Sequence, residues 1–563
     1  MLLKTPPSDA RLNRLNSTAP IRSRAAEEGG FQIPLWGVPL VLLLLYVCLF
    51  SGLGALGLVG PDEPRYAAIA RAMTETHDWI TPRLWGTPWF EKPVLYYWTA
   101  GIAMRLFGVS EFAARLPSAL AALLAVVAVA WTALRSYGVG AAWYSLLMLP
   151  SSVAMIGFSR AASPDMLFAG LLTAAMAVAS EMLQKPRPGP ILRFAFGFFL
   201  GAAVLAKGPA AVILAGGATL LWAAVSRQWR APFRFLHPLI IAVFCATALP
   251  WYVLCALRNP EFLRVFIWQH NFERYLTPIF EHRQPFWFFG PIFLLGILPW
   301  LPFLVSSVKD SATSLRSIRL ANSPALFVAC WALFTLLFFS LSQSKLPGYI
   351  LPAIPPALLL LCASTARHIQ QRSGMLLPVI VSIGSIFPVG IGIALAIRSH
   401  SPLVDAMLDA NFTRGFEIAL GVAIVCFVAI VGFSIRRQPN NALCIAASTV
   451  VILVFLANRF ILPVFDRIDS ARPAAIWAIQ DHSLSPDDVV VYGLPRAYQY
   501  GLNYYFDSSL SEWTPGARRA KILFSSRESL DSPPLSALPG GERTPATADG
   551  KIFLVVLRFA TEK

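Results

Sequence analysis

Long apolar runs recur along most of the chain, and they constrain its fold more than any other feature. A helix needs about 17–25 mainly apolar residues to cross a bilayer, and thirteen runs of roughly this length lie between residues 35 and 462. They occupy 35–59, 113–134, 141–158, 166–183, 191–206, 210–225, 239–257, 286–308, 324–342, 346–366, 375–397, 416–435 and 442–462. Only 13% of the 563 residues are charged, about half the usual share in a soluble protein. The pattern predicts an all-α polytopic membrane protein and excludes a soluble or disordered one.

The basic residues predict how the chain crosses the membrane. A shorter apolar stretch at 94–107 contains Arg105, so we expect it to be an interfacial helix and not a span. With that assignment most Lys and Arg of the short loops share one side with the tail 1–34, as the positive-inside rule requires. The N-terminus is then cytoplasmic and the C-terminus lies on the far side. The same clustering accounts for the net charge of +16 without a nucleic-acid partner.

Three segments on the far side are long, and the last of them predicts a separate domain. They are 60–112, which should contain interfacial helices, 258–285 and 463–563. Within the last, we expect helices at 472–481 and 496–505 and strands at 488–492, 521–524 and 551–557, with a loop at 529–550. The chain should therefore have a transmembrane domain at 35–462 followed by a small α/β domain.

Acidic residues beside the predicted spans are candidate reactive groups. Asp62 and Glu63 follow the first span, and Asp165 lies just before the fourth. An ionised acid costs about 2.5–3.5 kcal/mol at the centre of a membrane helix and less at its edge. These positions therefore indicate a function or a specific partner, although capping of a helix N-terminus is an alternative for each.

Basic residues also occur on the far side, against the general charge bias. The candidates are Arg65, Lys92, Lys207, Arg274 and Lys345. Such side chains can simply extend to the interface, but their position favours an anionic ligand such as a lipid phosphate. Cations can stabilise a departing phosphate, and a carboxylate can orient or deprotonate an acceptor. Together they fit transfer of a group from a phosphate.

A metal site is a weaker possibility. Two histidines, His270 and His282, lie in one outer loop with several glutamates, and Glu91 lies between aromatic residues and prolines in another. Histidine and carboxylate side chains are common ligands of zinc. We therefore expect a divalent metal, zinc or similar, as a possible cofactor, and no nucleotide cofactor.

Four motifs in the first outer loop resemble a known family. They read DEPRY at 62–66, DWITPRL at 78–84, FEKP at 90–93 and FAARLP at 112–117. This region resembles the lipid A aminoarabinose transferases, which belong with the protein mannosyltransferase-like GT-C membrane glycosyltransferases. Segments 160–165, 207–209, 282–287 and 345–352 extend the resemblance through the core.

The resemblance implies a thirteen-span GT-C fold in a bacterial inner membrane with a periplasmic active site. The donor would be an undecaprenyl-phosphate-linked sugar, aminoarabinose or similar, and the acceptor lipid A or a related envelope molecule. Asp62 and Asp165 would be the catalytic acids. The donor phosphate would lie near Lys92, Lys207, Arg274 and Tyr349, and a metal would bind Glu91 with His270, or with His282.

Two other functions remain open at this point. A transporter or flippase for a lipid-linked sugar would also have many spans, but it should carry ionisable residues near mid-membrane and show internal repeats. We find neither pattern in the sequence. A protein O-mannosyltransferase would keep the fold and change the acceptor. A hydroxyl acceptor would require Asp62 as a base, whereas a lipid A phosphate would only need to be positioned.

Overall fold

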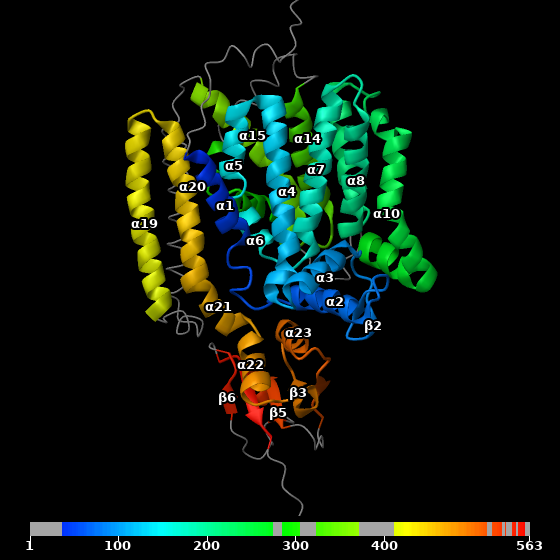
Figure 1. The fold of residues 1–563 in the computed structure, drawn as a ribbon, viewed down its shortest axis with the longest axis vertical. Coiled ribbons are helices and arrows are strands. Elements are labelled where there is room, and N and C mark those ends of the chain that lie inside the picture. The colour runs from blue at the N-terminus through cyan, green and yellow to red at the C-terminus, as the bar shows by residue number, and fades with distance from the viewer. Residues whose placement is uncertain are drawn as a thin grey trace, which may run out of the picture.

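The computed structural model is a bundle of long helices with a small α/β unit at one end (Figure 1). It describes residues 36–273, 284–304, 323–370, 410–514, 521–531, 535, 543–547 and 550–557. The bundle comprises α1 (Gly37–Leu45) with the π-helix η2 (Tyr46–Phe50), α4 (Glu111–Tyr137), α5 (Val139–Met148), α6 (Val153–Ser159), α7 (Pro164–Gln184), α8 (Pro190–Lys207), α9 (Ala210–Ser226), α10 (Pro238–Arg258), α12 (Phe289–Gly296), α14 (Pro324–Leu341), η7 (Pro347–Ala353) with α15 (Ile354–Gln370), α19 (Ala410–Ile435) and α20 (Pro439–Leu456).

The helices agree with most of the predicted spans. Eight described helices are long and apolar enough to cross a membrane, nine if the pair α5–α6, bent by 57°, counts as one span, and three more are apolar but shorter. These twelve coincide with twelve of the thirteen predicted spans, and the remaining one, 375–397, lies outside the described residues. The chain is thus a multi-pass helical membrane protein.

Two predicted spans are longer than the helices that the structure contains. The first helix ends at Phe50, so 51–59 leaves the helical path. Within the predicted span 286–308, the described residues form the 3-10 turn η5 (Phe286–Phe288) and α12, after which 297–302 turns. Gly52 and Gly54 follow the first helix, and Pro299 and Pro302 follow α12. Both residue types disfavour a continuing helix.

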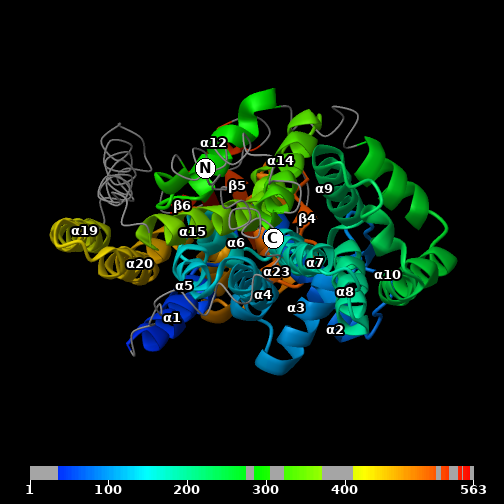
Figure 2. The same cartoon turned by 90° about the horizontal axis from the view of Figure 1, so that it is seen from above.

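Short elements cover one end of the bundle. Helices α2 (Asp62–Thr76) and α3 (Leu95–Phe107) lie across that end in Figure 1, joined by the hairpin β1 (Arg83–Leu84) and β2 (Thr87–Pro88). Helix α3 has 13 residues and is not among the candidate spans, in agreement with the expected interfacial helix at 94–107. Seen from above, α4 and α7 occupy the middle of the bundle, α19 and α20 one edge and α10 the other (Figure 2).

The C-terminal unit lies at the same end as α2 and α3 (Figure 1). The helical run from α20 continues through η8 (Ala457–Ile461) and α21 (Leu462–Asp469), past the expected boundary at 463. The unit then has α22 (Arg472–Ile476), η9 (Trp477–Asp481), η10 (Pro486–Asp488), β3 (Val489–Tyr492), α23 (Arg496–Tyr505), β4 (Ser511–Glu512), β5 (Ile522–Ser526), α24 (Arg527–Leu530), β6 (Arg543–Pro545) and β7 (Ile552–Val556). The sheet order is β4-β3-β5-β7-β6.

This unit confirms the expected helices and strands and corrects one loop. Strand β3 is parallel to β4 and β5, whereas β7 is antiparallel to β5 and β6. The stretch 529–550, expected to be a loop, contributes strand β6, because Arg543 to Pro545 pair with β7. A short strand of this kind is specified by its partner and not by its own pattern.

Candidate active site

The segment between η2 and α4 presents two neighbouring acids in opposite environments. Helix α2 begins at Asp62, directly after Pro61. The Asp62 side chain is 52% exposed and forms an ion pair with Arg65, one turn later. Glu63 is buried. The helix start therefore directs one carboxylate outward and the other into the protein.

Glu63 connects three segments of the chain. Its Oε1 accepts hydrogen bonds from Arg115 Nε at 3.1 Å and from the backbone N–H of Ala162 at 2.6 Å. Its Oε2 accepts from Arg115 Nη2 at 2.7 Å and from the N–H of Val59 at 3.0 Å. With two donors on each oxygen, this carboxylate is suited to holding the loops together. The geometry thus does not favour the catalytic role that we expected for Glu63.

Three arginines explain why the first helix ends early. Arg115, Arg160 and Arg472 donate hydrogen bonds to backbone carbonyls between residues 47 and 57. Arg160 reaches those of Val47, Cys48 and Ser51, Arg115 those of Leu53, Leu56 and Gly57, and Arg472 those of Gly54 and Ala55. Guanidinium groups thus replace the helical partners of these carbonyls, and the segment can leave the helix without losing its hydrogen bonds.

A first cluster of charges surrounds Arg65. Its Nη1 lies 2.9 Å from Glu91 Oε2, and Lys92 Nζ lies 3.4 Å from Glu91 Oε1. The guanidinium also stacks over the ring of Trp89, at 5.6 Å from the centroid. Burial by itself lowers the pKa of Arg65, but neighbouring groups, Glu91 and Asp62 among them, raise it above its ordinary value. The group therefore stays a cation next to two carboxylates.

A second cluster forms around Asp165 at the start of α7. Pro164 occupies the first turn of this helix, and the Ser163 side chain accepts a hydrogen bond from the N–H of Asp165. The Asp165 carboxylate forms an ion pair with Lys207 at the end of α8. Lys207 Nζ lies 4.6 Å from the centroid of the Tyr349 ring. Residues predicted separately from three outer loops are thus in contact.

Gly348 allows η7 to approach Asp165 closely. A Cβ atom added at this position would lie 2.8 Å from Asp165 Oδ2 and 3.1 Å from the Phe158 ring. Both distances are shorter than ordinary van der Waals contacts. The glycine in the sequence LPGY therefore permits the approach that brings Tyr349 to Lys207.

Hydrogen bonds tie the two clusters to the same end of the bundle. Ala162, bonded to Glu63, is three residues from Asp165. Ser118 Oγ of α4 donates to the carbonyls of Ala161 and Ser163, at 2.6 and 3.2 Å. Asp62 and Asp165 are therefore on one side of the bundle, as the threading predicted.

The C-terminal unit is anchored to this same end. Gly57 N donates to Asp466 Oδ1 at 2.7 Å, and the Tyr505 hydroxyl accepts from Leu58 N at 3.1 Å. Arg71 of α2 pairs with Asp507 at 2.8 Å. The unit therefore braces the short segment that leads to Asp62.

The remaining candidates are Lys345, Arg274, His282 and His270. Lys345 is buried and donates to the carbonyls of Ser342 and Gln284, and burial lowers its pKa. Arg274 and His282 lie outside the described residues. His270 lies in the π-helix η4 (Arg264–Glu273).

The metal site stays a prediction, because His282, one of its expected ligands, lies outside the described residues. Both oxygens of Glu91 already face cations, Arg65 and Lys92. In the part of the chain that the structure describes, no group of three or more His, Cys, Asp or Glu side chains is placed to hold a metal. We derive no step through a metal.

Sequence reasoning missed the residues that hold the site together. Arg115 and Ser118 lie inside a predicted span, and Arg160 begins a short loop. The signal available for Arg115 was its charge at the start of an apolar run, where an unpaired cation would be costly. Its partner, 52 residues earlier, could not be read from the pattern.

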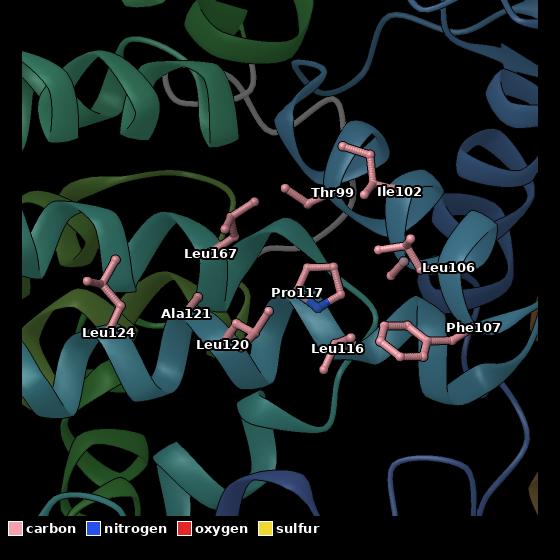
Figure 3. Close-up of a pocket in the computed structure, with 11 residues that line it drawn as sticks. Thr99, Ile102, Leu106, Phe107, Leu116, Pro117, Leu120, Ala121, Leu124 and Leu167 are labelled. Carbon is pink, nitrogen blue, oxygen red and sulfur yellow. The ribbon is translucent and has the colours of Figure 1, made fainter.

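An apolar groove lies beside the site, between α3, α4 and α7 (Figure 3). It has a volume of about 590 Å³. Its lining includes Phe107 of α3, Leu116 of α4 and Leu167 of α7. Leu167 is two residues beyond Asp165, and Leu116 follows Arg115. None of these lining side chains is charged, so the groove is suited to hydrocarbon.

This fold and site define a membrane glycosyltransferase of the GT-C type. A model of the dolichyl-phosphate-mannose-protein mannosyltransferase family matches residues 35–266. The chain belongs to the undecaprenyl phosphate-aminoarabinose arabinosyl transferases. The Aeromonas salmonicida (strain A449) member is 31% identical over 429 residues, 73% of this chain and 75% of the relative. The Edwardsiella ictaluri (strain 93-146) member is 29% identical over 475 residues, 79% of this chain and 83% of the relative.

Solved structures agree with this assignment. The crystal structure of ArnT from Cupriavidus metallidurans bound to undecaprenyl phosphate is 26% identical, with a TM-score of 0.71 over 92% of this chain and 97% of that one. The apo form of the same protein is 24% identical over the same shares, with a TM-score of 0.74. The second comparison supports the fold.

Proposed function

We propose that this protein transfers aminoarabinose, or a similar sugar, from an undecaprenyl-phosphate-linked donor to lipid A or a related envelope acceptor. The observation that carries the proposal is the contact of Asp165, Lys207 and Tyr349 from three separate loops, at the end of the bundle that also holds Asp62. The relatives are named for this arabinosyl transfer, and the Cupriavidus structure binds undecaprenyl phosphate.

The chemistry requires one bond to break and one to form at the anomeric carbon. The bond from this carbon to the donor phosphate oxygen breaks, and undecaprenyl phosphate leaves with the bonding electrons. An acceptor oxygen forms the new bond to the same carbon. Positioned cations are the protein groups that stabilise charge on a departing phosphate.

We assign the donor phosphate to the Lys207 side of the site. Lys207 is 10% exposed and lies between Asp165 and the Tyr349 ring. A cation in this partly dry position interacts more strongly with a phosphate than it would in water. Asp165 holds the ammonium group in place until the phosphate arrives.

We assign the acceptor to the Asp62 side. Asp62 is the most exposed of the three candidate carboxylates and lies beside Arg65. A lipid A phosphate is already anionic, so Arg65 and Lys92 would attract it and Asp62 would orient it, with no proton to remove. A hydroxyl acceptor would instead give up its proton to Asp62.

The apolar groove supports lipid substrates. Its lining of leucine, isoleucine and phenylalanine side chains would bury a hydrocarbon chain of such a lipid (Figure 3). A transporter would open to each side of the membrane in turn and would carry out no covalent step. Membership of a transferase family argues against that function.

We further propose thirteen spans, a cytoplasmic N-terminus, and an active site and C-terminal unit on the periplasmic face of the inner membrane. The charge bias of the loops and the shared position of the site and the C-terminal unit support this arrangement. Reporter fusions at the C-terminus test it, because a periplasmic reporter is active only if the final residues are outside.

A protein hydroxyl is the second candidate acceptor, because the matching family model describes protein mannosyltransferases. The experiment that separates the two compares cells with and without the protein. Mass spectrometry of lipid A should show an added aminoarabinose when the protein is present. An unchanged lipid A together with newly glycosylated envelope proteins would reject lipid A as the acceptor.

A further inference from the structure

The loop between α9 and α10 lies at the end of the bundle opposite the candidate active site. Helix α9 begins at Ala210, three residues after Lys207, and runs 17 residues away from it. Its far end is followed by Arg227, Trp229, Arg230 and the 3-10 turn η3 (Pro232–Leu236). None of these residues takes part in the proposed transfer.

Three arginines of this loop line one pocket. The pocket has a volume of about 470 Å³, and its lining is Arg227, Gln228, Trp229, Arg230, Ala231 and Arg234. Within the described residues, Arg227 and Arg230 form no hydrogen bond or ion pair through their side chains, and Arg234 donates one hydrogen bond, to the carbonyl of Lys185 at 3.1 Å. Three arginines thus line one pocket, and most of their N–H donors are available.

Among the residues that the structure describes, no carboxylate forms an ion pair with these arginines. The sequence has no Asp or Glu between Glu181 and Glu261. Glu181 is already bound to Arg135 at 2.8 Å and to Lys185 at 3.0 Å. Like charges held together in this way repel, so the pocket is stabilised when an anion enters it.

Backbone hydrogen bonds hold the loop that carries the three arginines. Arg227 adopts a left-handed conformation, with φ at 58°, and closes the end of α9. Gln228 N donates to the carbonyl of Ala223 at 3.0 Å, and Ala231 N donates to that of Gln228 at 3.0 Å. Ala231 is buried beneath the turn. A loop held by such bonds loses less entropy on binding than a flexible one.

The flank of the pocket is apolar and exposed. Trp229, Phe233 and Leu236 are 60%, 69% and 62% exposed. They precede α10 (Pro238–Arg258), a candidate span with few buried residues. Aromatic side chains at the end of a span favour the depth of lipid headgroups, where a ring meets both hydrocarbon and water.

We propose that this pocket binds the phosphate group of an anionic membrane phospholipid. The guanidinium groups of Arg227, Arg230 and Arg234 would contact the phosphate oxygens, a pairing that arginine geometry favours. Trp229 and Phe233 would lie against the glycerol and the upper acyl chains. Three basic side chains near an anionic surface predict a preference for phosphatidylglycerol over phosphatidylcholine of roughly 100-fold.

The test measures the lipid preference of the full-length protein in mixed detergent micelles. Phosphatidylglycerol and phosphatidylcholine are titrated separately, and bound lipid is counted by native mass spectrometry. The variant R227Q/R230Q/R234Q should lose the preference. The matched control R193Q/R436Q/R437Q removes the same charge from the same end of the bundle and should keep it.

Two further arms keep the proposal falsifiable. The variant R227K/R230K/R234K preserves the charge and should retain most of the preference. Retention would show that replacing these three arginines does not unfold the loop, so that the loss in the glutamine variant reports the missing charge. Inorganic phosphate at matched ionic strength should not displace the lipid. Equal losses in the pocket and control variants, or displacement by phosphate alone, would overturn the proposal. Transfer activity is measured in parallel, and its failure would concern the proposed function only.

Discussion

Replacing Glu63 by glutamine separates a bracing role from a catalytic one. Each Glu63 oxygen accepts two hydrogen bonds, one from Arg115 and one from a backbone N–H. A glutamine has only one oxygen, so its NH₂ group must face two donors whichever way it turns. The substitution also leaves the Arg115 guanidinium, 2% exposed, without its counter-charge.

The expected cost is large because the pair is buried. Removing one partner of a buried ion pair costs about 3–5 kcal/mol. The neighbouring change Asp62→Asn is a matched control, since Asp62 is 52% exposed and its buried partner Arg65 keeps a second carboxylate, Glu91. An ion pair with one exposed member contributes about 1 kcal/mol. We therefore expect Glu63→Gln, and not Asp62→Asn, to destabilise the protein.

The assay is thermal unfolding in detergent with a thiol-reactive dye. Five of the seven cysteines, Cys48, Cys255, Cys330, Cys362 and Cys444, are buried and react only after unfolding. Glu63→Gln should unfold at a clearly lower temperature than both the wild type and Asp62→Asn. If Glu63→Gln unfolded like the wild type and yet lost all transfer, the bracing role would be refuted and Glu63 would be catalytic.

Three further substitutions probe the remaining contacts. Lys207→Met should lower kcat about 100-fold, because it removes a cation from the departing phosphate, and an unchanged kcat would place the phosphate elsewhere. Gly348→Ala should lower turnover about 100-fold while the protein stays folded, since its Cβ would displace Asp165. Arg472→Lys should destabilise the protein by about 1.5–3 kcal/mol, because a lysine cannot bond Asp466 and the carbonyls of Gly54 and Ala55 together. Thermal unfolding of the Arg472 variant at the wild-type temperature would contradict the last expectation.

The elements that the sequence predicted are those with local signals. Apolar length identified the spans, and the pattern at 496–505 predicted α23 with the bounds that the structure has. The end of the first helix at Phe50 could not be predicted, because it depends on Arg115, Arg160 and Arg472, which lie far along the chain. Strand β6 was missed for the same reason, because it is recognised as a strand through its pairing with β7 and not through a pattern of its own.

The sequence predicted which residues belong to the candidate site, but not which of them form ion pairs with one another. Charge beside the spans selected Asp62, Asp165 and Lys207, and the family resemblance added Tyr349. No sequence pattern indicates that Asp165 pairs with Lys207, or that Arg65 lies between Asp62 and Glu91. The sequence analysis also grouped Glu63 with Asp62 because the two are neighbours in the chain. In a helix, however, consecutive side chains point in different directions, so one acid is exposed and the other is buried.

Transfer by the purified protein tests the central claim most directly. The protein in detergent is mixed with undecaprenyl phosphate-aminoarabinose and lipid A, and the lipid A is examined by mass spectrometry. The wild type should add the sugar, whereas Asp62→Asn and Asp165→Asn should add none while both variants remain folded at the assay temperature. Transfer by both variants at the wild-type rate would contradict the account.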